Sequence, residues 1–119
     1  MTVNLYDAPA YPLQGASKER FIGSVTFTIG AAGAISATSS DDAQIAGNTF
    51  LNGVCSLTYP ACSAVRIKGA IVGDGTVKEV VVTAASASAG TATVKTTASG
   101  VAASPNNGAR IMLGIWGTV

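Results

Sequence analysis

Two cysteines are the most reactive side chains in the sequence, and six residues separate them. Cys55 and Cys62 do not form a C-x-x-C motif, and no other metal ligand accompanies them. They could form a structural disulfide across a strand end, in an oxidising medium, if their Cα atoms came within reach. Alternatively, Cys55 is a small core residue and Cys62 is a half-buried loop thiol. The sequence leaves both interpretations open.

The acidic residues offer little for metal binding. Asp41 and Asp42 follow a serine and could supply hard oxygen ligands for half of a calcium site. No third acidic residue lies nearby, so a solvated turn is the favoured interpretation. The glycine-rich run 69–78 ends in a lysine but lacks the strand–loop–helix context of a phosphate-binding loop. We therefore expect no metal site and no cofactor.

The aromatic residues and the lack of histidine limit the ligands and the chemistry that this chain supports. Trp116 and Tyr59 could form a platform on which a sugar ring stacks, although a lone tryptophan in a closing strand is more often a core or interface residue. The chain has no histidine, which excludes Ser–His–Asp catalysis and almost every zinc site. We expect a protein that is not an enzyme.

The charge and composition of the chain limit the kinds of partner that it can bind. The 119 residues include seven basic and six acidic ones, for a net charge of +1, so no electrostatic footprint for nucleic acid exists. Charged residues make up only 11% of the chain, and Ala, Gly, Ser and Thr together make up about half. A surface with so few charges does little to discourage association between copies. We therefore expect a homo-oligomer held by apolar and small-residue contacts.

The elements that must position these residues are strands. In the run 21–29, alternate residues from Phe21 to Ile29 share one face, and short strands separated by turns continue to the end of the chain. Asn52-Gly53 is the strongest hairpin signal, and Pro60 ends the strand that follows it. The pattern predicts a single all-β domain, an antiparallel β-sandwich or jelly-roll-like fold of about seven to eight strands.

Two segments are expected along the chain. Residues 21–119 form the β-sandwich domain, and residues 1–20 form an extended N-terminal arm that contains two prolines. The period-2 pattern predicts that the core contains Val25, Phe27, Ile29, Leu57, Ile67, Val80, Val82, Ile111 and Leu113. The apolar residues of the arm are the candidate partner-binding residues, namely Leu5, Tyr6, Tyr11 and Leu13.

Two stretches carry a resemblance to a known class. The run NGVCSLTYPACSAVRIKGAIVGDG and the run KEVVVTAASASAGTATVKTTASGVAASPNNGARIMLGIWGTV resemble small virion proteins of tailed bacteriophages, in particular capsid decoration or cement proteins. The resemblance covers about residues 21–119. It implies a β-rich protein that binds the major capsid protein and stabilises the phage head, usually as a symmetric oligomer and often as a trimer at local symmetry axes.

The resemblance also implies a location on the virion surface after assembly in the host cytoplasm. The first nine residues lack a basic flank followed by an apolar run, so we expect no signal peptide, and no stretch is apolar enough for a membrane span.

The competing hypothesis is a receptor- or glycan-binding β module of a phage tail fibre or an adhesin. The fold would be much the same in both cases.

Overall fold

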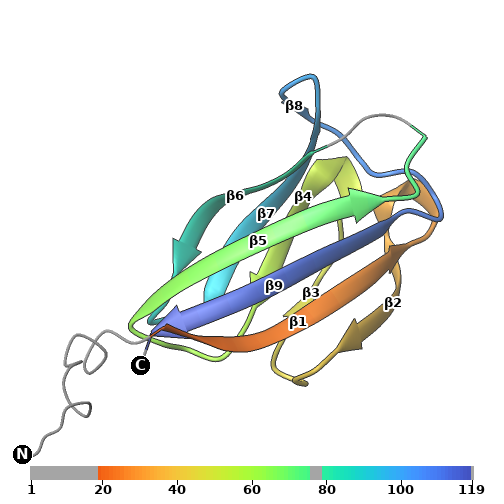
Figure 1. The fold of residues 1–119 in the computed structure, drawn as a ribbon. Helices are drawn as coiled ribbons and strands as arrows, with labels where there is room; N and C mark the ends of the chain where they lie inside the picture. Colours follow the sequence, from red (N-terminus) through yellow and green to blue (C-terminus); the bar gives the residue numbers. More distant parts are fainter. Residues whose placement is uncertain (1–18, 76–78, 119) are drawn as a thin grey trace, which may run out of the picture.

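The computed structural model describes residues 19–75 and 79–118. Two antiparallel sheets pack face to face as a sandwich (Figure 1), which confirms the expected fold class. Sheet A has the strand order β2-β1-β9-β5, and sheet B has the order β3-β4-β7-β6, with β8 paired to β7. The strands are β1 (Glu19–Ile29), β2 (Ile35–Ser40), β3 (Ala46–Gly47), β4 (Val54–Thr58), β5 (Ala64–Val72), β6 (Glu79–Ser86), β7 (Thr91–Ala98), β8 (Val101–Ala102) and β9 (Arg110–Thr118).

The number of strands slightly exceeds the expectation. The described ranges contain nine strands. Two of them, β3 and β8, have only two residues each and account for the excess. Strand β1 begins at Glu19, so the last two residues assigned to the arm belong to sheet A. The arm residues Leu5, Tyr6, Tyr11 and Leu13 lie outside the described residues.

Strand β1 shows both the strength and the limit of the alternating pattern. Val25, Phe27 and Ile29 are buried, as predicted. Phe21 was expected on the same inner face, but it is 52% exposed on the outer face. The reason is a β-bulge between Phe21 and Gly23, where one extra residue shifts the register against β9 and turns the preceding side chain outward.

The core lies between the two sheets and contains most of the predicted residues. Leu57, Ile111 and Leu113 are buried together with the three residues of β1, and Phe27 packs against Phe50 at a ring distance of 5.8 Å. The other predicted core residues are only partly buried against this cluster: Ile67, Val80 and Val82. They belong to β5 and β6, the terminal strands of their sheets, where no further strand covers them.

Asn52 and Gly53 form the predicted turn, and both have a left-handed backbone conformation. The φ angles are 60° at Asn52 and 77° at Gly53, which suits an asparagine followed by a glycine. This turn leads from β3 into β4, which pair as an antiparallel hairpin, and β4 ends at Thr58, just before Pro60. A Cβ atom on Gly53 would lie 2.6 Å from the backbone of Ala103, so this position also needs glycine for space.

Candidate interaction surface

The outer face of sheet A carries a cluster of two aromatic rings and an ion pair, here called the aromatic cluster: Glu19, Phe21, Arg66 and Trp116. The register places Phe21 and Arg66 opposite Trp116, one from each neighbouring strand. The Phe21 and Trp116 rings meet edge to face, with centroids 5.4 Å apart. The bulge in β1 is what brings Phe21 to this face.

Arg66 contacts both Trp116 and Glu19 of the aromatic cluster. Its guanidinium carbon lies 4.5 Å from the centre of the Trp116 ring, within the range of a cation–π interaction. The same group donates from Nη2 to Glu19 Oε1 at 3.0 Å and from Nε to Glu19 Oε2 at 3.2 Å. The hydrogen bonds from Arg66 lower the pKa of Glu19 and raise that of Arg66 itself.

The Trp116 ring packs flat against the sheet because residue 114 is a glycine. A Cβ atom on Gly114 would lie 2.7 Å from Cη2 of the Trp116 ring, so a side chain there would displace the ring. Trp116 is therefore fixed from three directions, by Gly114 beneath it, by Phe21 at its edge and by Arg66 over its face. An aromatic group held in this way loses little conformational entropy on binding a partner.

A shallow groove of about 490 Å³ continues from the aromatic cluster along the outer face of sheet A. It runs over the central strands and includes Met112, which is 38% exposed. Its other outward-facing lining residues are Ser24, Thr26, Lys68, Ala70 and Gly114. The groove is mainly apolar with one cation, and together with the aromatic cluster it forms what we call the sheet A surface.

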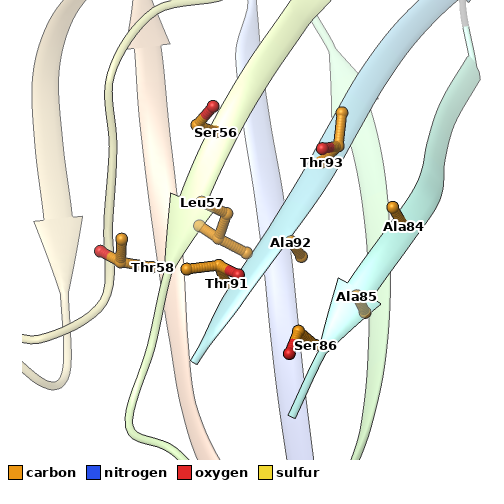
Figure 2. A pocket seen from close by; sticks show the side chains of 9 residues that line it. All are labelled: Ser56, Leu57, Thr58, Ala84, Ala85, Ser86, Thr91, Ala92 and Thr93. Atoms are coloured by element: carbon orange, nitrogen blue, oxygen red, sulfur yellow. The ribbon is translucent and has the colours of Figure 1, made fainter. Parts of the chain in front are cut away.

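The outer face of sheet B is different in chemistry. A hollow of about 380 Å³ lies across β4, β7 and β6, and Figure 2 shows the side chains that line it. Small neutral side chains with hydroxyl or methyl groups line it, including Ser56, Thr58, Ala84, Ser86, Thr91 and Thr93. No charged residue borders this hollow. Its hydroxyl groups can donate and accept hydrogen bonds, and its lining contains no titratable side chain that could activate one of them as a nucleophile.

The acidic pair considered for calcium has internal partners. Asp41 Oδ2 accepts hydrogen bonds from the backbone nitrogen and the hydroxyl of Ser24, at 3.1 and 2.9 Å. Asp42 Oδ1 accepts from the backbone nitrogen of Gln44 at 2.8 Å, which is an Asx turn. Within residues 19–75 and 79–118, no three His, Cys, Asp or Glu side chains gather as a metal site.

The two cysteines are free thiols in this structure. Cys55 is buried in the middle of sheet B, opposite Val94, and its burial raises the pKa of the thiol. Cys62 is half-buried in the connection between β4 and β5, and its Sγ donates to the carbonyl of Ala64 at 3.2 Å. The arrangement matches the alternative in which one is a core residue and the other a loop thiol.

The structure separates the two aromatic residues considered as a sugar platform. Trp116 lies on the outer face of sheet A, whereas Tyr59 is buried directly after β4. The Tyr59 hydroxyl lies 2.8 Å from the carbonyl of Thr91 and 3.2 Å from that of Ser86, and donates within the fold. The structure therefore does not bring these two rings together as a platform.

The sequence reasoning missed the central members of the sheet A surface. The alternating pattern places Phe21 on the same face as Val25, and it predicts no contact for Arg66. One local signal was available for the first of these: Phe21 and Ile22 are adjacent apolar residues, which breaks the alternation and is typical of a bulge. Nothing local indicates that Arg66 meets Trp116, because that contact depends on β9 lying between β1 and β5.

Comparison of this chain with protein-family models, with curated proteins and with solved structures finds no match. Among the described residues, no helix has the length and apolar character needed to cross a membrane.

Proposed function

We propose that this protein is a non-enzymatic virion structural protein, a capsid decoration or cement protein that binds and stabilises the head of a tailed bacteriophage. Its partners are the major capsid protein and further copies of itself, and the resemblance implies a trimer. It works on the capsid surface after assembly in the host cytoplasm, without nucleic acid, membrane or cofactor. The sheet A surface is the observation that carries this proposal.

The position of the aromatic cluster supports a role in attachment. The cluster includes Glu19, the residue that directly follows segment 1–18 in the chain. Buried aromatic and arginine side chains contribute most of the binding energy in protein interfaces. Leu5, Tyr6, Tyr11 and Leu13 would add further apolar anchors. A protein partner large enough to contact both regions fits this arrangement.

The chemistry of the remaining surface supports a structural role over a catalytic one. The outer face of sheet B carries neutral Ser, Thr and Ala side chains. Each side chain whose pKa is shifted is already packed or hydrogen-bonded within the fold. These side chains are Glu19, Arg66, Cys55 and Tyr59. Surfaces of this kind suit tight packing against other subunits.

One observation weighs against the glycan-binding alternative. Sugar rings stack on the open face of an aromatic side chain. Arg66 covers one face of Trp116, and Gly114 of β9 lies against the ring. The arrangement favours a protein partner that contacts Phe21 and the groove.

Capsids that lack the protein provide the test. Purified protein is mixed with such capsids, and bound copies are measured by co-sedimentation and imaged by electron microscopy. A chain that starts at Ser17 and the variant Phe21→Ser should each bind at least about tenfold more weakly, which corresponds to about 1.4 kcal/mol. Circular dichroism checks that both remain folded.

The matched control is Val101→Ser, which removes another exposed apolar side chain, 68% exposed, from β8. It should bind like the wild type. Equal binding by the truncated chain, Phe21→Ser and the control would move the contact away from the sheet A surface. Failure of the wild-type protein to bind any capsid would contradict the proposed function itself.

A further inference from the structure

Strand β5 is a long terminal strand with an undisturbed register. It pairs with β9 over nine consecutive residues, from Ala64 to Val72, without a bulge. The other terminal strands are less suited to accept a further strand: β3 has two residues, and bulges interrupt β2 and β6 where they pair with their neighbours. Among the described residues no strand pairs with the other side of β5, and such a regular edge leaves a row of backbone donors and acceptors available to another chain.

The core is incompletely covered along this same edge. Ile67 and Ile71 of β5 and Val80 of β6 are only partly buried. A hollow of about 440 Å³ lies between the two strands and is lined by both. Figure 1 shows β5 and β6 on the same side of the sandwich, each at the end of its sheet. Apolar area therefore remains to be buried directly beside the unpaired backbone.

The two isoleucines on the inner face of β5 are placed symmetrically about Gly69. Ile67 and Ile71 lie two residues to either side on the inner face, and Lys68 and Ala70 lie one residue to either side on the outer face. Gly69 itself has no room for a side chain, since a Cβ atom would lie 2.5 Å from Leu113 and 2.7 Å from Val80. An antiparallel partner with the same sequence would therefore match this edge around a two-fold axis at Gly69.

We infer that the β5 edge binds the β5 edge of a second copy, in antiparallel register with Gly69 opposite Gly69. Ile67 of each copy then faces Ile71 of the other and completes the open side of both cores. On the outer face, Lys68 of each copy faces Ala70 of the other. No like charges stand directly opposite each other in this register, which is the condition for a stable cross-strand pair.

The pairing goes beyond the proposed function because it needs no capsid. A two-fold contact is self-complementary and produces an even number of copies: it joins two of the proposed trimers into a hexamer, or forms a dimer where the three-fold contact is absent. Light scattering of the free protein therefore tests it separately from any capsid experiment. The wild-type mass should be an even multiple of 11.7 kDa.

Charge reversal at an exposed position tests the register. Ala70 is exposed, so a charged side chain there leaves the single subunit intact. Ala70→Glu places a carboxylate opposite Lys68 twice per interface and should lower the dissociation constant about fivefold, whereas Ala70→Lys should raise it about fivefold. The matched controls Thr38→Glu and Thr38→Lys, at an exposed site on the β2 edge, should leave it unchanged.

The double variant Lys68→Glu with Ala70→Lys distinguishes this register from its neighbours. It restores opposite charges only when residue 68 faces residue 70, and it should then return the dissociation constant to the Ala70→Glu value. Equal dissociation constants for Ala70→Glu and Ala70→Lys, with both variants folded as judged by thermal melts, would overturn the inference. An odd number of copies in the wild type would overturn it as well.

Discussion

The guanidinium of Arg66 lies 4.5 Å from the centre of the Trp116 ring. Because Arg66 is also bonded to Glu19, the ionisation of that carboxylate controls how firmly the cation is held over the ring. Trp116 is the single tryptophan of the chain, so its fluorescence reports on the contact directly.

Acidification should release Arg66 from Glu19. Because the pKa of Glu19 is lowered, the ion pair is present at neutral pH and is lost as the pH falls through that lowered pKa. Trp116 fluorescence should change with a midpoint below 4.5, the ordinary value for Glu. The Glu19→Gln variant should lack this transition, and Glu79→Gln should keep it. Identical titration curves for Glu19→Gln and the wild type would contradict the coupling.

Truncation of Phe27 should strongly destabilise the fold. Its side chain is fully buried against Phe50, so Phe27→Ala should lower the free energy of unfolding by about 3–5 kcal/mol in a chemical melt. Phe21→Ala provides the comparison, since half of that side chain is exposed, and it should cost much less. A loss below about 1 kcal/mol for Phe27→Ala would be inconsistent with the register of β1.

Removal of the Tyr59 hydroxyl should cost about 1 kcal/mol of unfolding free energy, because its hydrogen bond to the carbonyls of Thr91 and Ser86 is lost. Burial raises the pKa of Tyr59, with a smaller contribution from Cys62. A raised pKa means that the folded state holds the proton more tightly, so stability is lost as the pH rises through that pKa. Melts above about pH 10 should therefore destabilise the wild type more than Tyr59→Phe; equal losses would argue against this assignment.

The two thiols should differ in reactivity. Cys62 is half-buried and should react with a thiol reagent in the native protein, whereas Cys55 should react only on unfolding because it is buried and its pKa is raised. Cys62→Ser should remove the native-state reaction, and Cys55→Ser should preserve it. Failure of both thiols to react in the unfolded, unreduced protein would instead indicate a disulfide.

High salt should leave the oligomer intact. Thirteen charged residues in 119 are too few for an interface dominated by ion pairs, and salt screens exposed charges far more than it affects apolar burial. Light scattering at increasing salt concentration measures this. A stable monomer at micromolar concentration and ordinary salt would rule out self-association altogether.

Alternation of side chains was sufficient to predict the centre of the sandwich. Val25, Phe27 and Ile29 share a face because successive residues of a strand point to opposite sides, and the structure buries all three. The same logic failed at Phe21, because a bulge inserts one residue and reverses the faces. The local sequence pattern predicts which residues of a strand alternate between faces. It does not predict a bulge that arises where the strand pairs with its neighbour.

The order of strands within each sheet could not be read from the chain in the same way. Ile67 and Val80 fit a core pattern as well as Ile111 does, yet they are only partly buried. Their strands end the two sheets, whereas β9 lies in the middle of sheet A. The aromatic cluster depends on this order as well, since Arg66 and Phe21 meet Trp116 from opposite sides only because β9 lies between β5 and β1.

The central place of β9 also governs when the protein can fold. Strands β1 and β5 are joined only through β9, which follows both of them in the chain. A nascent chain that has not yet released Arg110–Thr118 from the ribosome lacks the partner that joins both strands into one sheet. Pairings between such distant segments are slow, and the unpaired apolar strands remain exposed until they form. Sheet A therefore cannot be completed before β9 has been synthesised, and its apolar strands stay open to aggregation until then.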